Sequence, residues 1–173
     1  MMQGYGLSEA TPVISTNVPM KKQHRFGSSG KLVQPLDIRI LDDEGREQPN
    51  GTKGEIVIRG ENVMAGYWKN PTATADTVRD GWLYTGDMAK RDADGFIYLV
   101  DRKKDVIISG GENLYPVQIE DFLRAHDKIK DVAVIGLPDE RLGEIAAAII
   151  EIKEGMECTE AEINEYCLGM PRY

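Results

Sequence analysis

The chain has 173 residues, of which 41% are hydrophobic, a normal content for one globular domain or two small ones. Its 21 Lys and Arg residues are outnumbered by 29 Asp and Glu residues, and the net charge of −8 argues against a nucleic-acid partner. The longest purely apolar run, residues 145–150, is much shorter than the roughly 20 residues of a membrane span. We therefore expect no membrane span and no signal peptide. Cys158 and Cys167 match no disulfide or zinc pattern, which indicates reduced thiols in a cytoplasmic protein.

The first motif, residues 3–9, places two glycines around an aromatic ring and adds a hydroxyl and a carboxylate. Its distinctive residues are Gly4, Tyr5, Gly6, Ser8 and Glu9. Glycine lets a ligand approach the backbone, and a tyrosine ring offers a stacking face to a base. The serine can donate to a phosphate, and the glutamate can ligate a hard cation. The order therefore suits a nucleotide with a hard cation, and a simple Gly-rich turn is the alternative.

Antiparallel strands and one short helix are predicted next. Residues 36–41 roughly alternate apolar and polar side chains, and residues 55–59 form a second apolar run after a turn. Asn70 is a helix-capping residue, and Pro71 is tolerated in a first helical turn. We therefore predict a helix from this point to about Val78.

A lone carboxylate at Asp87 ends the second motif, residues 82–87. Its two oxygens can accept hydrogen bonds from both hydroxyls of a ribose. A solvated turn aspartate is the alternative. Residues 87–92 and 96–100 flank an Asp-Gly turn at 93–95, which predicts a β-hairpin leading into the next motif.

The third motif, residues 101–120, reverses the acidic character of the chain. Arg102 and the lysines at 103–104 place three cations in a row, which points to an anionic ligand. A β-branched run at 106–108 predicts a strand. The glycine pair at 110–111 then offers bare backbone that a ligand can approach.

The last third reads as alternating helices and strands. A helix is predicted at 116–125, followed by strands at 131–137 and 144–152. The second of these strands is almost wholly apolar, so we expect it to be buried on both faces. Thr159 and Glu162 form a capping box for a final helix.

Together the three motifs resemble the adenylate-forming enzymes, the superfamily of acyl-CoA synthetases, luciferases and peptide-synthetase adenylation domains. The amino-acid sequence of the third motif looks most like that of fatty and aromatic acyl-CoA synthetases. The resemblance implies an α+β fold. Residues 1–101 would form the antiparallel, β-barrel-like end of a large AMP-binding domain, and residues 102–173 an incomplete α+β lid domain.

The family also implies roles for the first motif. The tyrosine matching Tyr5 lies along the adenine, and the hydroxyl matching Ser8 meets the α-phosphate. The glutamate matching Glu9 helps to hold magnesium. Gly4 and Gly6 would complete the ATP or AMP contact surface.

Roles for the second and third motifs follow in the same way. The aspartate matching Asp87 binds the ribose diol, and the arginine matching Arg102 contacts the ribose and phosphate. Lys104 corresponds to the hinge about which the lid swings. Residues 110–111 and Glu112 would face coenzyme A (CoA).

The implied activity is that of an acid:CoA ligase that uses ATP, magnesium, CoA and a carboxylic acid, expected to be a fatty acid. The upstream phosphate loop and the final catalytic lysine of the family lie outside this sequence. We therefore expect a C-terminal fragment that needs the upstream part of its own chain and has no useful ligase activity alone. The length of the acid and the oligomeric state leave no signal in the sequence.

Three alternatives stay open. The chain can belong to another adenylating enzyme, either a peptide-synthetase domain or a luciferase-like oxygenase. It can also be a non-catalytic nucleotide-binding or interaction module. A purely structural β-rich domain is the third, and it leaves the order of the three motifs unexplained.

Overall fold

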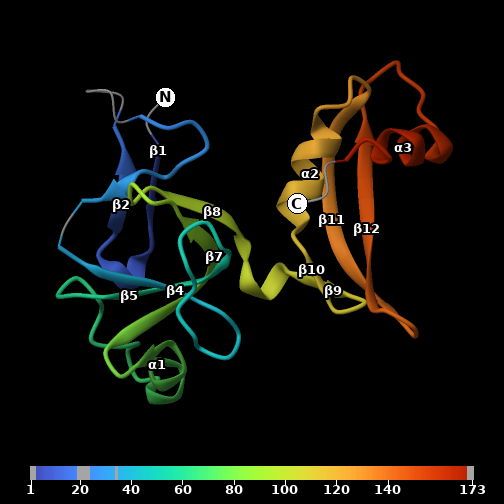
Figure 1. The fold of residues 1–173 in the computed structure, drawn as a ribbon. Coiled ribbons are helices and arrows are strands. Elements are labelled where there is room, and N and C mark those ends of the chain that lie inside the picture. The colour runs from blue at the N-terminus through green and yellow to red at the C-terminus, as the bar shows by residue number, and fades with distance from the viewer. Residues whose placement is uncertain (1–2, 19–23, 34, 171–173) are drawn as a thin grey trace. The chain divides into compact units, whose positions relative to one another are not determined.

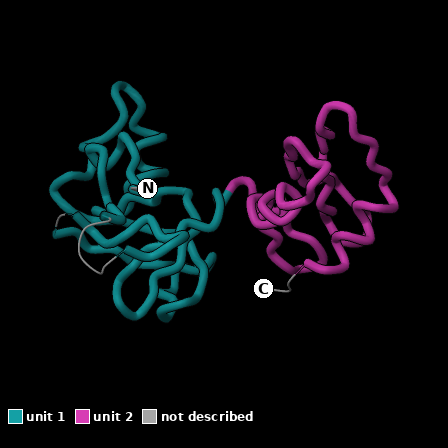
Figure 2. Tube along the Cα trace, turned by 90° about the horizontal axis from the view of Figure 1, so that it is seen from above, with its two compact units in different colours: residues 1–103 teal, residues 104–173 magenta. Residues whose placement is uncertain are grey.

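The structure is a computed structural model, and it describes residues 3–18, 24–33 and 35–170. The chain forms two compact units, Met1–Lys103 and Lys104–Tyr173, which Figure 2 shows in different colours. Figure 1 shows that strands predominate in both units. The α+β character agrees with the sequence expectation. In the described part of the chain the sheets stay open, so the barrel-like end does not close into a barrel.

The first sheet of unit 1 is small and antiparallel. Its strands, in spatial order, are β1 (Gln3–Gly6), β2 (Val13–Asn17) and β3 (Lys31–Leu32). The register shifts between Tyr5 and Gly6, so that Gly6 pairs with Val13. A Cβ at Gly6 would lie 1.7 Å from the carbonyl oxygen of Pro12. The backbone packing itself therefore requires this glycine.

The second sheet of unit 1 is larger and carries the predicted hairpin. In spatial order its strands are β4 (Asp37–Leu41), β5 (Gly54–Arg59), β7 (Trp82–Arg91) and β6 (Val78–Arg79), and β8 (Ile97–Arg102) also pairs with β7. All of these pairings are antiparallel, which confirms the predicted strands. Asp92 closes the β7–β8 turn because its Oδ1 accepts the backbone N–H of Phe96 at 2.9 Å.

Hydrogen bonds connect the two sheets of unit 1. Gly30 bridges to Ile97, and the Ser28 hydroxyl donates to the carbonyl oxygen of Ile97 at 2.9 Å. Ser28 is itself buried, so this contact belongs to the interior. Fully buried apolar side chains from both sheets fill the core, including Ile14, Ile56, Ile58, Leu83 and Ile97. This packing brings Tyr5 of β1 within hydrogen-bond distance of Asp87 in β7.

A tight hairpin opens the strand region of unit 2. It joins β9 (Ile107–Ser109) to β10 (Glu112–Leu114) through Gly110 and Gly111. Both glycines have positive φ, +60° and +85°. A two-residue hairpin turn with positive φ at both positions favours glycine strongly. The glycine pair is therefore needed for the turn, and the second short strand was not foreseen from the sequence.

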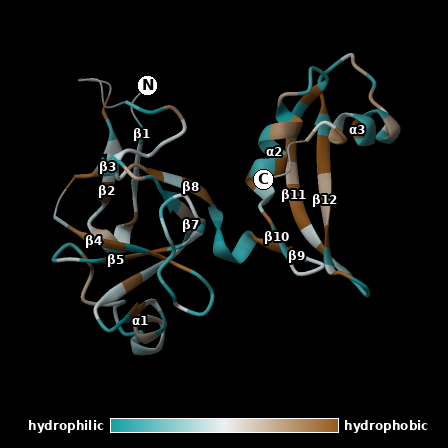
Figure 3. Ribbon diagram, in the orientation of Figure 1, coloured by the Kyte–Doolittle hydropathy of each residue, from teal (hydrophilic) through white to brown (hydrophobic). Residues whose placement is uncertain are grey.

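The longest strands of unit 2 are β11 (Ile129–Asp139) and β12 (Gly143–Ile152), in a sheet of order β10-β9-β12-β11. One face of this sheet packs against the helices around Leu123, Val132 and Val134. The other face carries apolar residues that stay partly in solvent, and Ile149 is 62% exposed. Figure 3 shows hydrophobic residues along much of both strands. The expectation that β12 is buried on both faces is wrong, because only one face has a layer over it among the described residues.

The helices are short and begin where the sequence predicts. They are α1 (Pro71–Thr77), α2 (Pro116–Arg124) and α3 (Glu160–Cys167). The Asn70 side chain accepts the N–H of Ala73 at 3.1 Å, and the Thr159 hydroxyl accepts that of Glu162 at 3.3 Å. Both predicted N-caps are thus confirmed. No helix in the described ranges is long and apolar enough to cross a membrane.

Candidate functional site

Three residues singled out in the sequence meet in unit 1. The phenolic Oη of Tyr5 donates to Oδ2 of Asp87 at 2.8 Å, and Nε of Arg102 lies 3.4 Å from Oδ1 of the same carboxylate. Tyr5 lies on β1. Asp87 of β7 and Arg102 of β8 are directly opposite each other in the antiparallel pairing of these two strands. The Asp87 side chain is 16% exposed and that of Arg102 is 67% exposed. The carboxylate is therefore sheltered, and the guanidinium is available to a ligand.

The core holds Tyr5 in place. Tyr5 is 7% exposed and belongs to the hydrophobic cluster of unit 1. Burial raises the pKa of the phenol, and the charge of Asp87 raises it further, so the hydroxyl stays protonated and donates at neutral pH. Little of the ring is open to a base. The structure places the phenolic donor against Asp87, and the stacking role that the resemblance implies stays a prediction.

A bulge in β7 presents Asp87. Glu55 of β5 pairs with Met88 of β7, while Val57 pairs with Tyr84. Three residues of β7 therefore lie opposite a single residue of β5. Bulges of this kind leave side chains outside the regular ladder and redirect them. Here the bulge lets the Asp87 side chain reach Tyr5.

Side-chain hydrogen bonds within the bulge hold its shape. The hydroxyl of Thr85 donates to the carbonyl oxygen of Ile56 at 2.7 Å and accepts the N–H of Asp87 at 3.1 Å. Gly86 has φ +70°, a conformation that residues with a Cβ rarely adopt. The bulge thus accounts for the Thr-Gly-Asp order of the second motif. The threonine makes its internal hydrogen bonds, the glycine adopts the positive φ, and the aspartate side chain reaches Tyr5.

Glu55, on β5, also holds the bulge of β7 in place. Sequence analysis did not identify this residue as part of the site. Its side chain is 10% exposed; Oε1 accepts the N–H of Gly86 at 3.1 Å, and Oε2 accepts Nζ of Lys103 at 3.0 Å. Partial burial by itself would lower the pKa of Lys103, but its bonds to Asp43 and Glu55 outweigh burial and raise it. The available signal was a single carboxylate directly before the apolar residues 56–58 of β5.

The serine of the first motif lies at a small pocket. The pocket has a volume of about 370 Å³ and is lined by Gly4, Tyr5, Gly6, Leu7, Ser8, Pro12 and Val13. Ser8 begins a single turn of 3-10 helix, Ser8–Ala10, which is separated from β1 by Leu7 alone. Ser8 and Tyr5 therefore line the same pocket, and Glu9 is the next residue of the turn.

Glu9 is held by contacts from Met64 and Tyr67. The phenolic Oη of Tyr67 donates to Oε1 of Glu9 at 2.8 Å, and the backbone N–H of Met64 donates to the Glu9 carbonyl oxygen at 2.8 Å. The hydrogen bond to Glu9 is the main reason that the pKa of Tyr67 is raised. Oε2 of Glu9 accepts no hydrogen bond from residues in the described ranges, so one oxygen is available to a cation.

The other predicted site residues lie in unit 2. Lys104 is 74% exposed, with its Nζ 4.0 Å from Oδ1 of Asp105. Gly110 donates its N–H to the carbonyl oxygen of Leu142 at 2.8 Å, which anchors the turn. A Cβ at Gly111 would meet nothing within 4 Å, so the backbone there is open. Glu112 follows as the first residue of β10.

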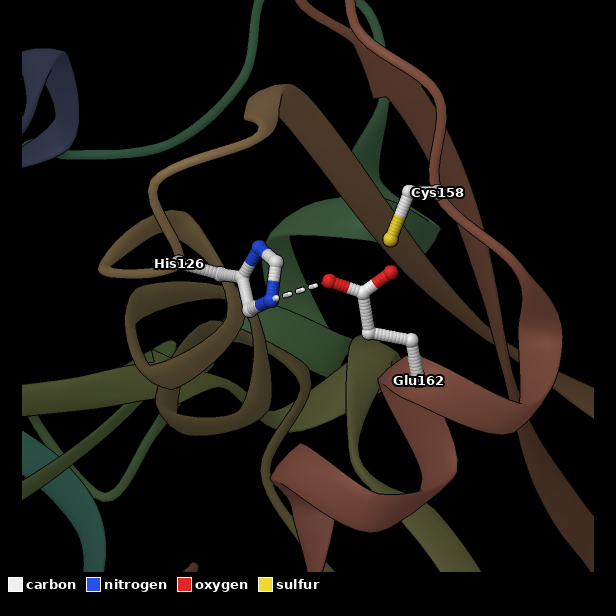
Figure 4. Close-up of side chains that lie close together, drawn as sticks. All are labelled: His126, Cys158 and Glu162. Carbon is white, nitrogen blue, oxygen red and sulfur yellow. Dashed lines mark ion pairs between the residues drawn. The ribbon is translucent and has the colours of Figure 1, made fainter.

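A separate cluster in unit 2 joins His126, Cys158 and Glu162, as Figure 4 shows. The three ligand atoms lie within 4.8 Å of one another. His, Cys and Glu are all known zinc ligands, so the cluster has suitable donor types. Sequence analysis did not identify the cluster, because His126 is remote from Cys158 and Glu162 in the chain and the three residues match no metal-binding spacing.

The protein's own groups already satisfy this cluster. Nζ of Lys128 lies 2.7 and 2.9 Å from the two carboxylate oxygens of Glu162. Nδ1 of His126 accepts the backbone N–H of Lys128, which leaves the ring proton of a neutral imidazole on Nε2, the atom that faces Glu162. Burial, followed by the Glu162 charge, raises the pKa of Cys158 and so disfavours the thiolate that a metal needs. We therefore interpret the cluster as a structural network.

The tyrosine, aspartate and arginine on a β-rich unit, followed by a small α+β unit, define the class of adenylate-forming enzymes. Sequence comparison agrees with this class. Residues 1–68 match the family described as AMP-binding enzyme, and residues 118–170 match the AMP-binding enzyme C-terminal domain. The chain belongs to the AMP-binding enzyme family.

Its relatives act on different acids, as their names indicate. The chain is 43% identical over 167 residues to a long-chain-fatty-acid–CoA ligase from Yersinia pestis, covering 96% of this chain and 29% of the relative. It is 44% identical over 154 residues to a feruloyl-CoA synthase from an Amycolatopsis species, covering 89% and 31%. An o-succinylbenzoate CoA synthetase from Bacillus subtilis, solved with its acyl-adenylate intermediate, has a TM-score of 0.88 and 33% identity, covering 99% and 35%. The chain thus spans about a third of the length of each.

Proposed function

We propose that this chain is part of an ATP-dependent acid:CoA ligase that forms an acyl-adenylate and then an acyl-CoA. The observation that carries the proposal is the convergence of Tyr5 and Arg102 on the carboxylate of Asp87. It is supported by family membership and by relatives that are CoA ligases or synthetases.

Asp87 is the proposed ribose-binding residue. A carboxylate has about four lone-pair sites, and Tyr5 occupies only one of them. The remaining sites can accept hydrogen bonds from the two hydroxyls of a ribose. Because Tyr5 is buried and donates to Oδ2, it holds the carboxylate in one orientation before the nucleotide arrives.

Arg102 is the proposed cation next to the nucleotide phosphate. Its guanidinium lies beside Oδ1 of Asp87 and is mostly exposed, so it can reach a ribose oxygen or a phosphate without leaving its strand. A guanidinium can donate two parallel hydrogen bonds to such oxygens. The pair therefore offers an acceptor to the sugar and a donor to the phosphate.

Glu9 is the proposed magnesium ligand. Magnesium prefers oxygen ligands and is often held by one or two carboxylates together with substrate phosphates. Glu9 fits this requirement, because Tyr67 fixes Oε1 while Oε2 is open among the described residues. When bound, the ion would neutralise the phosphate charge that develops during adenylation.

The reaction proceeds in two displacements. A carboxylate oxygen of the acid attacks the α-phosphorus of ATP, and the bond to pyrophosphate breaks. The thiol sulfur of CoA then attacks the acyl carbonyl carbon, the bond to AMP breaks and the thiol proton is released. The first step makes a good leaving group of a carboxylate oxygen, which is a poor one by itself.

The proposed lid residues serve the second displacement. By resemblance, Lys104 is the hinge, and residues 110–111 with Glu112 face the CoA thiol. The open backbone at Gly111 suits a narrow ligand that approaches closely. A hinge motion between two half-reactions is a known form of gating.

The acid is proposed to be a fatty acid, although the relatives named above span fatty, aromatic and succinylbenzoate acids. The carboxylate is the part common to all of them. Substrate comparison in the ligase that contains this chain would decide, because kcat/KM for palmitate, ferulate and o-succinylbenzoate separates the three classes. A higher value for ferulate or o-succinylbenzoate would contradict the fatty-acid assignment.

Calorimetry of AMP binding tests the site itself. We expect AMP to bind the chain, and we expect Asp87→Ala and Arg102→Ala each to weaken binding by roughly tenfold or more, as for a lost charge-assisted hydrogen bond. Asp37→Asn is the matched control, because Asp37 is an exposed carboxylate that pairs with Arg59 on the same sheet. Equal AMP affinity in all four proteins would contradict the proposed nucleotide site. AMP binding without ligase activity in the longer protein would favour a non-catalytic nucleotide-binding module.

A further inference from the structure

Glu55 is a buried acid in a position that needs an explanation. It is 8% exposed, and it is the one charged residue classed as buried within the described ranges. Burying a carboxylate is costly unless the charge is paired and hydrogen-bonded. Glu55 is the second residue of β5 and precedes three buried apolar residues, so its burial costs stability unless its contacts compensate.

Both oxygens of Glu55 have partners, and each partner is adjacent to a proposed nucleotide-binding residue. Oε1 accepts the N–H of Gly86, the residue before Asp87. Oε2 accepts Nζ of Lys103, the residue after Arg102. One carboxylate thus joins the bulge of β7 to the residue that follows β8.

Lys103 has a second acidic partner, Asp43, whose ion pair can be compared with that of Glu55. Nζ of Lys103 lies 3.0 Å from Oδ1 of Asp43 and also 3.0 Å from Oε2 of Glu55. Asp43 is 72% exposed, whereas the Glu55 side chain is 10% exposed. Solvent screens the first ion pair, so it should contribute little, while the second is partly desolvated and hydrogen-bonded.

We propose that Glu55 is a positioning residue, which holds Asp87 and Arg102 in register for the nucleotide by fixing Gly86 and Lys103. The effect on nucleotide binding rests on the proposed function. The contacts of Glu55 with Gly86 and Lys103, here called the tether, lie within unit 1 and do not depend on it. Lys103 is also the last residue of unit 1 and precedes the proposed hinge, Lys104. The tether therefore ends where the hinge begins.

Limited trypsin digestion tests the tether without any activity assay. Trypsin must extract the side chain of the lysine after which it cuts, so a paired Lys103 should be cut slowly. We expect Glu55→Gln to accelerate cleavage after Lys103 by about tenfold, measured by intact-mass spectrometry, with cleavage after Lys104 unchanged. Asp43→Asn should change neither rate appreciably. Equal acceleration by Asp43→Asn, or none by Glu55→Gln, would overturn the tether.

AMP affinity tests the positioning role. We expect Glu55→Gln and Lys103→Gln to weaken AMP binding about five- to twentyfold, and Lys103→Arg to restore most of it, because arginine keeps the charge. Asp43→Asn should bind as the wild type does. If Asp87→Ala loses AMP while Glu55→Gln and Lys103→Gln retain full affinity, the positioning role is wrong and the nucleotide site stands. If Asp87→Ala keeps full affinity, the site and the positioning role both fail.

Folding must be separated from positioning. Glu55 is buried, so circular dichroism and thermal unfolding of Glu55→Gln accompany each measurement. If that variant does not fold, the Lys103→Gln and Lys103→Arg pair decides alone, because Lys103 is 41% exposed and its substitution leaves the core intact. Equal AMP affinity of those two variants would then overturn the proposal.

Discussion

The hydroxyl of Tyr5 donates to the carboxylate of Asp87 at 2.8 Å, although the two residues are 82 positions apart in the chain. The tyrosine is buried and the carboxylate is 16% exposed, so the bond lies at the edge of the core. A hydrogen bond to a charged group in such a place is stronger than one in water. The proposed ribose-binding group is therefore fixed by the interior of unit 1.

The first prediction concerns this bond. Tyr5→Phe keeps the ring and removes only the donor, so the core should stay packed and the free energy of unfolding should fall by about 1 kcal/mol. AMP affinity should fall roughly tenfold, because the carboxylate loses its fixed orientation. Urea unfolding and calorimetry measure the two effects. Unchanged AMP affinity in Tyr5→Phe would contradict the orienting role of the Tyr5 hydroxyl.

The second prediction concerns Tyr67 and Glu9. In the ligase that contains this chain, Tyr67→Phe should raise the magnesium concentration for half-maximal rate by about tenfold, as for other residues that orient a metal ligand. Glu9→Gln should raise it more. Initial rates at saturating ATP and varied magnesium measure this. Tyr84→Phe is the control, since Tyr84 lies in the same unit and stacks under Arg79.

The Tyr67 hydroxyl gives an independent signal in this chain. Its pKa is raised mainly by the hydrogen bond to Glu9, so Glu9→Gln should lower it. Tyrosine labelled with carbon-13 at Cζ reports the titration by NMR, and Tyr67→Phe identifies the resonance. An unchanged Tyr67 pKa in Glu9→Gln would contradict the contact itself.

The third prediction concerns the glycine turn of unit 2. Gly111 has φ +85°, and a Cβ there would meet nothing within 4 Å, so the cost of a side chain comes from the backbone alone. Gly111→Ala should lower the free energy of unfolding by about 1–2 kcal/mol. Gly111→Asn should cost less, because asparagine tolerates this conformation better. Equal losses for the two variants in urea unfolding would contradict this explanation.

The fourth prediction concerns the pH dependence of the network in Figure 4. The hydrogen bond from Lys128 holds the pKa of Glu162 below its usual range, with smaller contributions from the Lys128 charge and from the Cys158 thiol. The folded state then binds fewer protons than the unfolded state. The stabilisation should be complete above the unfolded pKa of about 4.3 and lost as pH falls through the lower folded value.

Glu162→Gln is the variant that tests this dependence. The thermal midpoint of the wild type should exceed that of Glu162→Gln at pH 7, and the gap should close in acid. Glu160→Gln is the control on the same helix. A gap that persists at pH 2 would show that charge is not the source of the stabilisation.

The fifth prediction concerns the isolated chain. Its 173 residues should produce no acyl-CoA from ATP, fatty acid and CoA at an enzyme-like rate, because they span only about a third of the relatives' length. Thioester formation measured by mass spectrometry provides the test. Turnover at an enzyme-like rate would contradict this prediction and would place all catalytic groups within these residues.

Local elements were predictable because their signals lie within a few residues of one another. The N-caps at Asn70 and Thr159 were identified from the capping side chain and the residues that follow it. The β7–β8 hairpin was identified from an Asp-Gly turn between the runs at 87–92 and 96–100. Each of these patterns is set by the geometry of a single turn, which the sequence displays directly.

The candidate site was predictable only in its parts. Motif chemistry pointed to Tyr5, Asp87 and Arg102 separately, but the contact among them depends on the packing of two sheets. Glu55 carried almost no signal, because its importance comes from burial and from partners 31 and 48 residues away. Such distant contacts leave no fixed spacing in the sequence.

The amino-acid sequence by itself determined where this chain turns, which residues begin its helices and which chemical groups it can offer to a nucleotide. The tertiary structure decided which of those groups meet and which side chains lose water. It buried Glu55 and Tyr5 and left one apolar face of β12 partly open among the described residues. The physical reason is that burial depends on whether another layer covers a surface, and that layer is built from residues remote in the chain.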